Sequence, residues 1–485
     1  MNHLSSDRLQ DIAERLAGQA PAADYWSLRL VSEETDLLAV RQGVAEPSFL
    51  GSQAGAMVTI VKAGGIGYAA TSDLSPAGLR AAAERATYWA GQHARLGLFD
   101  AQLYPRSDAQ TEYRSQTLEP WDARTSEEKL ALLQDACAAL KTDDRIADWS
   151  AWLGHRRACQ LLVTSIGGRS LQTFELVSPG LAAVANAGSQ TQRRTGGGAD
   201  WNQQGGLERL AAVGFRDDAR RVAEEAVALL SAPECPTGTM DLVLLPSQMV
   251  LQIHESIGHP LELDRILGDE RNYAGTSFVT PEMFEHYRYG SELLNVTFDP
   301  SVGGELATYA ADDEGTLAAR EYLIRNGVLE RPLGGRLSQA RSGLPGVANS
   351  RASGWDRPPI DRMANINLEP GDSSLDDLVR RVERGVLMDT NRSWSIDDSR
   401  NKFQFGCELG RLIEDGELKR LVRNPGYRGI SASFWLSLAG VGDRESWQVR
   451  GVRNCGKGEP SQVVGVGHAA PPCLFQRVSV FGGGA

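Results

Sequence analysis

The first half of the chain alternates apolar and polar residues over short stretches, a pattern typical of strands with one buried face. Residues 25–31 and 37–44 carry it, and residues 56–62 and 66–70 flank Ala63-Gly64-Gly65, which indicates a hairpin turn. Four further strands are predicted, with a hairpin at Gly167-Gly168, at residues 146–153, 157–165, 170–177 and 181–189. This half is therefore expected to form a largely antiparallel sheet.

Stretches with helical periodicity lie before, between and after these groups of strands. Apolar residues recur every three to four positions in four stretches, at residues 9–16, 78–90, 125–140 and 217–230. Ser75 and Pro76 suit the cap and first turn of the second helix, and Thr125-Ser126-Glu127-Glu128 is a capping signal for the third. We expect an α+β domain with flanking helices over residues 1–232, with a middle segment from about residue 120.

The second half is richer in strands and turns. Proline and glycine cluster at residues 233–238, after a predicted helix, which indicates a domain boundary. A strand at 240–245, a helix at 375–385 and two hairpins with Asn-Gly and Asp-Gly turns follow, the hairpins at residues 322–329 and 411–418. A chain of 485 residues exceeds one typical core, so we expect a second, β-rich domain over residues 239–485.

Three glycine-rich stretches are predicted to lack regular structure. Residues 195–200 should form a flexible loop, and residues 334–359 a mobile surface segment. Residues 451–458 should form a glycine-rich turn around Cys455.

Composition excludes some classes of function. The net charge is −12 and no block of Lys or Arg occurs, so direct binding to nucleic acid is not expected. No run approaches 18 apolar residues and the N-terminus lacks the features of a signal peptide, so we expect no membrane span and a cytoplasmic location. The six cysteines are scattered without a CxxC pair, which favours free thiols.

The candidate chemistry lies in His254-Glu255-Ser256-Ile257-Gly258-His259, since two imidazoles can bind a metal and a carboxylate can take the proton of a water. The spacing is HExxxH, one residue longer than the HExxH of common zinc peptidases. On a regular helix the two rings would point roughly 140° apart. A π-helical turn would bring them together, and Gly258 should let the backbone distort. By spacing alone, two ordinary buried histidines remain an equal alternative.

A third ligand must come from elsewhere in the chain. Cys455 is the first candidate, because a thiolate binds zinc tightly. His468 is the second candidate, and Glu262 or Asp264 could also serve. A small apolar residue in a turn remains the plain alternative for Cys455.

These residues resemble the TldD/PmbA family of metallopeptidases, also called modulators of DNA gyrase. The resemblance rests on His254-Glu-Ser-Ile-Gly-His259 with Leu261-Glu262 and Asp264, on Asp312-Asp-Glu-Gly315, and on Cys455-Gly456-Lys457. It implies zinc held by His254, His259 and Cys455, with Glu255 as the general base. It also implies a homodimer, or a heterodimer of a motif-bearing subunit such as this one with a PmbA/TldE-like paralogue.

The function that these residues favour is zinc-dependent hydrolysis of unfolded or short peptides by a metal-activated water. Glu262, Asp264, Gly456, Lys457 and His468 are candidates for supporting the site or binding substrate. Two alternatives remain: a cysteine hydrolase with Cys455 as nucleophile, and a non-catalytic partner protein with a structural metal.

Overall fold

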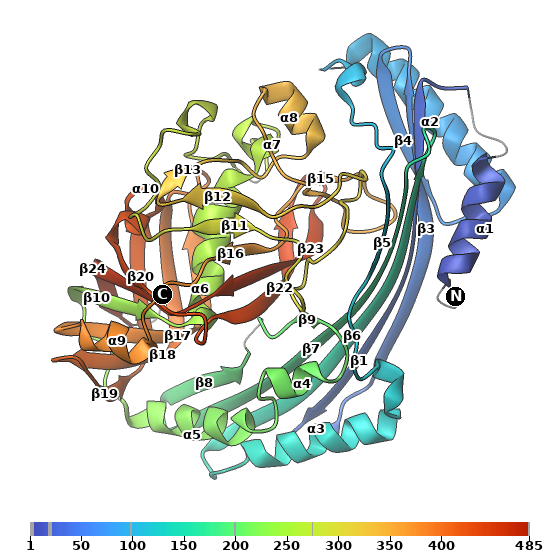
Figure 1. The fold of residues 1–485 in the computed structure, drawn as a ribbon. Helices are drawn as coiled ribbons and strands as arrows, with labels where there is room; N and C mark the ends of the chain where they lie inside the picture. The colour runs from blue at the N-terminus through green and yellow to red at the C-terminus, as the bar shows by residue number, and fades with distance from the viewer. Residues whose placement is uncertain (1–3, 18–21, 98, 198–199, 274, 484–485) are drawn as a thin grey trace.

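A long curved sheet from the first half of the chain lies against a second, β-rich body formed by the rest, and its concave side faces that body (Figure 1). The computed structural model describes residues 4–17, 22–97, 99–197, 200–273 and 275–483. The two-part α+β architecture confirms the predicted fold class.

Within the described residues the first sheet has nine strands, and only the β5–β7 pairing is parallel. The main order is β4-β3-β1-β6-β7-β5, with β2 paired to β1 and both β8 and β9 paired to β7. The strands are β1 (Tyr25–Arg41), β2 (Val44–Ala45), β3 (Phe49–Lys62), β4 (Gly65–Thr71), β5 (Gln110–Arg114), β6 (Ile146–Thr164), β7 (Arg169–Ala187), β8 (Gln190–Gly196) and β9 (Gln203–Gln204).

Several strands are longer than the sequence predicts. Residues 25–31 and 37–41 belong to the single strand β1, Val44 begins β2, and the four stretches between 146 and 189 form only β6 and β7. The apolar pattern is interrupted where polar residues such as Glu33 line the concave face, and Glu33 of β1 pairs there with Arg156 of β6 at 2.5 Å. The interruption therefore marks what the strand faces, and the strand does not end there.

The two faces of this sheet meet different partners. Leu28 and Leu30 of β1 point outward and pack in one hydrophobic cluster with the helices that cover that face. Arg29 between them points inward, and its guanidinium donates to the carbonyls of Gly354 and Arg357 in the second body, at 2.9 and 2.7 Å. Because side chains alternate along the strand, β1 packs on the helices with one set of residues and contacts the second body with the other.

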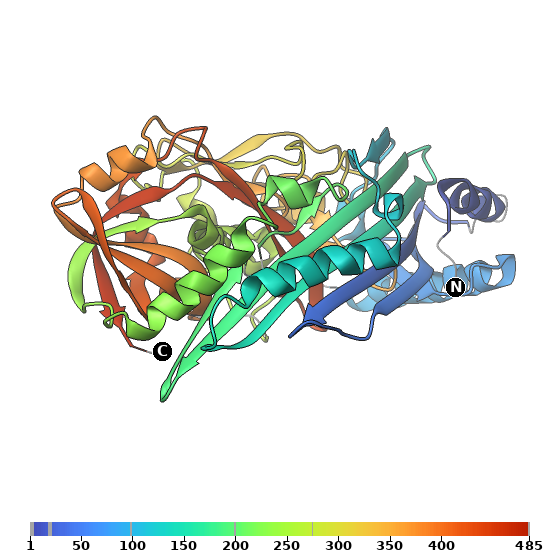
Figure 2. The same ribbon diagram turned by 90° about the horizontal axis from the view of Figure 1, so that it is seen from below.

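Helices cover the outer face at both ends of the sheet (Figures 1 and 2). They pack on the sheet through two clusters of buried Leu, Ala, Ile and Val side chains. The predicted caps are confirmed: Ser75 accepts from the Gly78 amide at 3.1 Å, and Thr125 forms a reciprocal capping box with Glu128. The helices of this part are α1 (Ser6–Ala17), α2 (Pro76–Leu96), α3 (Ser126–Leu140), α4 (Arg209–Ala212) and α5 (Asp218–Ser231).

The second body is built around a ring of strands. Because β10 pairs with both β17 and β24, the order β10-β17-β18-β20-β24 closes on itself and leaves no open edge in the ring. Two more strands, β19 and β21, pair outside it. The bounds are β10 (Gly238–Leu244), β17 (Arg384–Ile396), β18 (Lys402–Glu414), β19 (Glu417–Val422), β20 (Pro425–Ile430), β21 (Leu438–Val441) and β24 (Cys473–Gly482).

Smaller elements complete this body. A four-stranded sheet contains β11 (Val296–Phe298), β12 (Glu321–Arg325), β13 (Val328–Leu329) and β16 (Ile366–Leu368). Two hairpins pair β14 (Ser350–Arg351) with β15 (Ile360–Asp361) and β22 (Gln448–Lys457) with β23 (Gln462–Ala470). Short helices are α7 (Leu263–Ile266), α8 (Arg336–Ser342), α9 (Leu375–Arg380) and α10 (Ser431–Phe434).

Both predicted hairpins of the second half are confirmed as β12–β13 and β18–β19. Their turn residues all have positive φ: 48° and 77° at Asn326 and Gly327, and 52° and 75° at Asp415 and Gly416. This is the backbone that Asn-Gly and Asp-Gly turns adopt between two antiparallel strands.

Four other expectations are wrong. Residues 334–359 are not simply a surface segment, because they contain α8 and β14 and bury Val347, Ala348 and Asn349. The helix predicted at 375–385 ends at Arg380, since β17 begins at Arg384. Residues 451–457 belong to strand β22, so Cys455 lies in a strand and not in a turn. The loop predicted at 195–200 is wrong for Thr195 and Gly196, which belong to strand β8, and its residues 198 and 199 lie outside the described residues.

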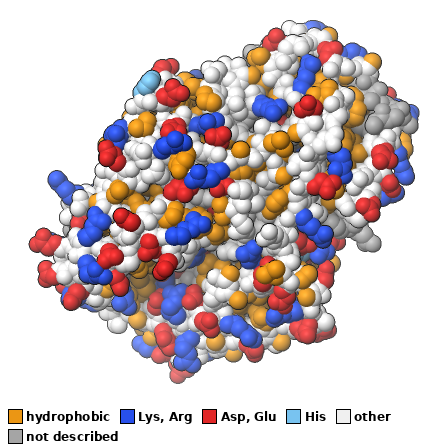
Figure 3. All heavy atoms as spheres, in the orientation of Figure 1, with side chains coloured by type: hydrophobic (Ala, Val, Ile, Leu, Met, Phe, Trp, Pro, Cys, Tyr) orange, Lys and Arg blue, Asp and Glu red, His pale blue; other side chains and the backbone are white. Residues whose placement is uncertain are grey.

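The surface charges are mixed and the cysteine thiols are free, as the sequence suggests. On the face shown in Figure 3, acidic and basic side chains are interspersed. All six cysteines are free and buried. In the part of the chain that the structure describes, no helix has both the length and the apolar character needed to cross a bilayer.

Candidate metal centre

The HExxxH motif continues helix α6 (Pro246–Ile253), which lies in the middle of the second body (Figure 1). The next residues, His254–Gly258, form a π-helical turn in which the His259 amide donates to the His254 carbonyl. A 3-10 turn, His259–Leu261, follows. The widened turn that the spacing predicts is therefore present, but it begins directly at His254 and not near Gly258.

Gly258 has a different role from the one expected. Its φ of −57° and ψ of −66° are helical, so the backbone does not require a glycine. A β-carbon at this position would lie 2.0 Å from the sulfur of Met363, a buried residue. Glycine is needed here because the Met363 side chain packs directly on the helix.

Replacing Gly258 with Ala is expected to destabilise the fold by about 1–3 kcal/mol, because a buried methionine must move. The free energy of unfolding in urea, measured with chelator present, tests this. Gly91→Ala is the matched control: Gly91 lies within α2, nothing lies within 4 Å of its added β-carbon, and alanine should stabilise that helix by roughly 0.5–1 kcal/mol. Equal stability of Gly258→Ala and the parent would contradict the packing argument.

The turn brings together three side chains that could hold a metal ion. One ligand atom each from His254, His259 and Cys455 lies within 4.8 Å of the other two, and all three residues are buried. The distance from the Cys455 Sγ to the His259 Nε2 is 3.8 Å. Zinc bond lengths near 2.1 and 2.3 Å in tetrahedral geometry place a nitrogen and a sulfur roughly 3.5 Å apart. The donor set and its spacing thus fit a zinc ion.

Hydrogen bonds orient the His254 imidazole. The Ile366 carbonyl can only accept, so His468 donates from its Nδ1 at 3.1 Å. Burial and the neighbouring His254 hold the pKa of His468 well below its usual value, so the ring is neutral and its Nε2 accepts from the His254 Nδ1 at 2.8 Å. The His254 Nε2 is left with a lone pair. His468 is thus placed to orient His254, which fits its candidacy as a supporting residue better than its candidacy as a ligand.

A carboxylate orients the His259 imidazole. The His259 Nδ1 donates to the Glu262 Oε2 at 2.9 Å, which leaves the His259 Nε2 lone pair facing the sulfur of Cys455. Burial opposes the charge of Glu262, but Lys457 and His259 outweigh it and hold the pKa of this carboxyl well below its usual value. An ionised partner of this kind makes a histidine a stronger metal ligand.

Cys455 reaches the site from β22, and a buried arginine holds its sulfur. The Arg362 guanidinium donates to the Cys455 Sγ at 3.0 Å and to the Cys455 carbonyl at 2.5 Å. Burial alone would raise the pKa of the Cys455 thiol, but Arg362 and His259 outweigh it and lower that pKa. A thiolate is the form that binds a metal.

The remaining predicted residues form a buried ionic network behind His259. The Lys457 ammonium lies 2.5 Å from Asp264 and 3.6 Å from Glu262. Burial raises the pKa of Asp264 to about 7, against the opposing charge of Lys457. Neither Glu262 nor Asp264 belongs to the His-His-Cys cluster; both lie behind it. Gly456 lies between Cys455 and Lys457 and is exposed.

Glu255 lies on the same π turn and is also buried. Arg400, at the tip of the β17–β18 hairpin, donates to the Glu255 Oε2 at 3.1 Å. Arg400 has a φ of 59°, an uncommon backbone for a non-glycine residue that is often found at functional sites. The sequence reasoning missed Arg362 and Arg400, because neither lies near a motif and their proximity exists only in the folded chain.

Comparison with known proteins decides the family. A model described as the PmbA/TldA metallopeptidase C-terminal domain matches residues 237–482, just over half of the chain. The chain belongs to the PmbA/TldD metallopeptidase family. A second model of this family, metallopeptidase domain 1, matches residues 26–90. The resemblance seen in the sequence is thereby confirmed.

Relatives within the PmbA/TldD family are named as metalloproteases. One from Methanothermobacter thermautotrophicus is 28% identical over 476 residues, which are 98% of this chain and 97% of that protein. A zinc metalloprotease TldD homolog from Saccharolobus solfataricus is 29% identical over 199 residues, 40% of this chain and 42% of that protein.

Solved structures share the fold. A candidate modulator of a DNA gyrase from Thermotoga maritima superposes with a TM-score of 0.74 at 17% identity, over 97% of this chain and all of that chain. TldE from Thermococcus kodakarensis gives 0.72 at 16% identity, over 98% of this chain and all of that chain.

His468→Ala is expected to weaken zinc binding about 10–100-fold, because it removes the partner that fixes the His254 ring. Competition with a zinc-binding dye measures the affinity. His286→Ala is the control, since His286 is exposed. Unchanged zinc affinity in His468→Ala would mean that the His254–His468 hydrogen bond does not serve the metal.

Proposed function

We propose that this protein is a zinc-dependent peptidase that hydrolyses unfolded or short peptides. The observation that carries the proposal is the convergence of His254, His259 and Cys455 within 4.8 Å, with Glu255 on the same turn. Family membership and the names of the relatives support it.

The three converging side chains would hold the ion. When bound, zinc would supply a Lewis acid that polarises a peptide carbonyl and makes a water more acidic. Glu255 would take the proton of the attacking water and pass it to the leaving amine. Arg400 would hold the Glu255 carboxylate in place until substrate enters. Arg362 would keep Cys455 ionised, and His468 and Glu262 would keep both imidazoles in the tautomer that binds a metal.

The burial of the site favours extended substrates. His254, Glu255 and His259 are each 4–5% exposed, so only a chain that can enter the protein in extended form would reach them. We further propose that the protein works as a dimer, either with itself or with a TldE-like subunit, because TldE has the same fold.

Two rival functions make different predictions in one experiment. Peptide cleavage is measured before and after chelation, and again after zinc is added back. The zinc peptidase loses activity with chelator and recovers it with zinc. A cysteine hydrolase that uses Cys455 keeps its activity in chelator, and a non-catalytic partner protein cleaves nothing in either state; both results would overturn the proposal.

A further inference from the structure

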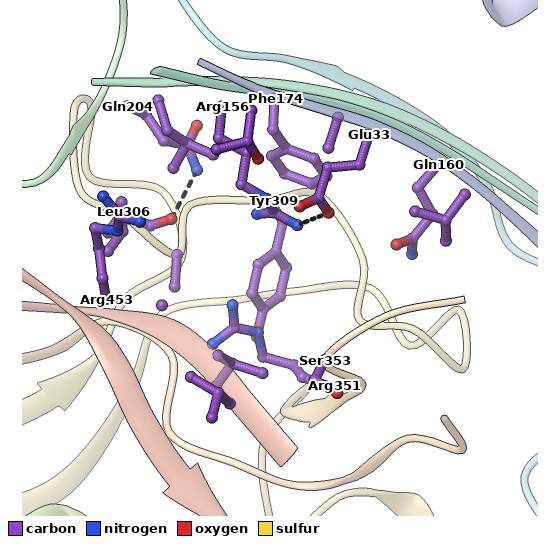
Figure 4. Close-up of a pocket in the computed structure, with 18 of the residues that line it drawn as sticks. Glu33, Arg156, Gln160, Phe174, Gln204, Leu306, Tyr309, Arg351, Ser353 and Arg453 are labelled. Atoms are coloured by element: carbon purple, nitrogen blue, oxygen red, sulfur yellow. Dashed lines mark hydrogen bonds and ion pairs between the residues drawn. The ribbon is translucent and has the colours of Figure 1, made fainter. Parts of the chain in front are cut away.

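A pocket of about 500 Å³ lies between the concave face of the sheet and the second body, separate from the metal-binding side chains (Figure 4). Its walls come from β1, β6 and β7 on one side and from β22 and β23 with the loop around Tyr309 on the other. None of His254, Glu255, His259 and Cys455 lines it. A volume of this size is typical of small-ligand sites.

Most charged groups that line this pocket are already paired. Glu33 pairs with Arg156, and Asp313 accepts from the Gln160 amide at 2.5 Å and from the Ala352 backbone at 2.7 Å. Asp312 accepts backbone amides, one of them from Thr316 at 2.8 Å. The carboxylates of the pocket are therefore occupied by partners within the protein.

A second set of partners accounts for the other side chains. Asp36 accepts from the Trp121 indole at 3.0 Å, and His155 pairs with Glu175. Arg351 donates to the Met363 carbonyl at 2.7 Å and lies over the Tyr309 ring. Of the charged side chains that line the pocket, only Arg453 is left without a partner of this kind among the described residues.

Arg453 differs from all of these. Among the described residues no carboxylate or carbonyl forms a hydrogen bond or ion pair with its guanidinium. Arg453 is an exposed residue whose guanidinium is partly covered by protein. This partial burial, and then the neighbouring cation Arg156, lower the pKa of Arg453. Its guanidinium lies against β6, where an added β-carbon on Gly154 would be 3.3 Å from the Arg453 Nη1.

A β-bulge aims Arg453 and its neighbour into the pocket together. In the β22–β23 pairing Val452 is opposite Val466 and Cys455 is opposite Val464, so Arg453 and Asn454 share the place opposite Gly465. In a regular strand, successive side chains would point to opposite faces. Here both line the pocket, while the next residue, Cys455, turns its sulfur towards His259. Bulges often re-aim side chains beside active sites.

We propose that Arg453 and Asn454 form a receptor for a carboxylate of the peptide substrate, and that the group bound is its C-terminal carboxylate. A guanidinium with an adjacent amide offers several N–H donors on one side, which suits a carboxylate. The remaining wall offers Phe174, Leu306 and Tyr309 to the side chains that precede the terminus. That the ligand is a peptide rests on the proposed function; the charge and shape of the receptor do not.

Binding of a fluorescent hexapeptide to the full-length Glu255→Gln protein, loaded with zinc, tests this receptor without cleavage. Three peptides are compared: the free acid, its C-terminal amide, and the amide with Glu as the last residue. We expect the free acid to bind about tenfold more tightly than the amide, and Arg453→Ala to remove that difference. Arg420→Ala, at an exposed arginine of β19, changes the net charge equally and should preserve it.

The outcomes separate the possible sources of the effect. If the amide with a terminal Glu binds as tightly as the free acid, the receptor recognises a carboxylate but not the terminus itself, and the assignment to the C-terminus is overturned. Equal binding of free acid and amide to the parent overturns the receptor altogether. If Arg453→Ala still prefers the free acid, the carboxylate binds elsewhere, such as on the metal, and the proposed receptor is again overturned. Because no outcome depends on cleavage, failure here leaves the proposed peptidase activity standing.

Discussion

Replacing Glu255 with Gln is expected to reduce peptide cleavage by about 10²–10⁴-fold while the protein keeps its zinc. Glutamine has nearly the same shape as glutamate but cannot take a proton from water at neutral pH. Since the proposed ligands are His254, His259 and Cys455, the substitution leaves all of them in place. The measurement is kcat with a short peptide, together with the zinc content of the same sample.

The matched control for this substitution is Glu292→Gln, because Glu292 is an exposed glutamate outside the site. It should leave both quantities unchanged. Cleavage at the parental rate in Glu255→Gln would remove Glu255 from the mechanism. Loss of zinc together with activity would mean that this carboxylate holds the metal.

The arginine beside Glu255 explains why the carboxylate can be buried at all. A buried carboxylate without a partner carries a large free-energy penalty, which ion pairing reduces. Arg400 supplies that partner from the tip of the β17–β18 hairpin, at 3.1 Å. The position of Glu255 is therefore fixed by two parts of the chain that are 145 residues apart.

The sequence predicts the π turn because the motif itself contains the reason for it. Two ligands five residues apart cannot face one ion on a regular helix, so the spacing alone requires a wider turn. Hairpins with Asn-Gly and Asp-Gly turns and the capped helices are predictable for the same reason: the residues that determine them are adjacent in the sequence.

Features that depend on distant partners are the ones that the sequence does not reveal. The polar residues in β1 resemble a break between two strands, because only the folded chain shows that Glu33, Thr35 and Asp36 line a pocket against the second body. Gly258 suggests backbone freedom, whereas its role is set by Met363, which lies 105 residues further on. The same holds for Arg362, whose contact with the Cys455 sulfur has no local signature.

The sequence also does not show whether a histidine such as His468 binds a metal directly or orients a ligand. A histidine near a metal motif is a reasonable ligand candidate, and its distance from His254 is short. What distinguishes a ligand from a partner is the other nitrogen of the ring, and that nitrogen donates to the Ile366 carbonyl. The tautomer therefore assigns the role, and it is set by a backbone atom 102 residues away.

Cys455→Ala should remove zinc from the purified protein, and its affinity for zinc should fall by more than the roughly 10–100-fold that loss of a supporting partner produces. The thiolate is one of three proposed ligands, and the Arg362 charge that favours it would be left facing a methyl group. Zinc content by mass spectrometry and peptide cleavage in added zinc are measured together. Cys159→Ala is the control, because Cys159 is equally buried but lies in the first sheet.

This variant also separates the zinc peptidase from the cysteine hydrolase, since both lose activity but for different reasons. In the zinc peptidase, activity and zinc are lost together, and a large excess of zinc restores part of the cleavage because His254 and His259 remain. In the cysteine hydrolase, the metal content is unaffected by the substitution and no amount of zinc restores cleavage, because the nucleophile is gone. Full zinc occupancy in Cys455→Ala would therefore exclude Cys455 as a ligand, whatever happens to activity.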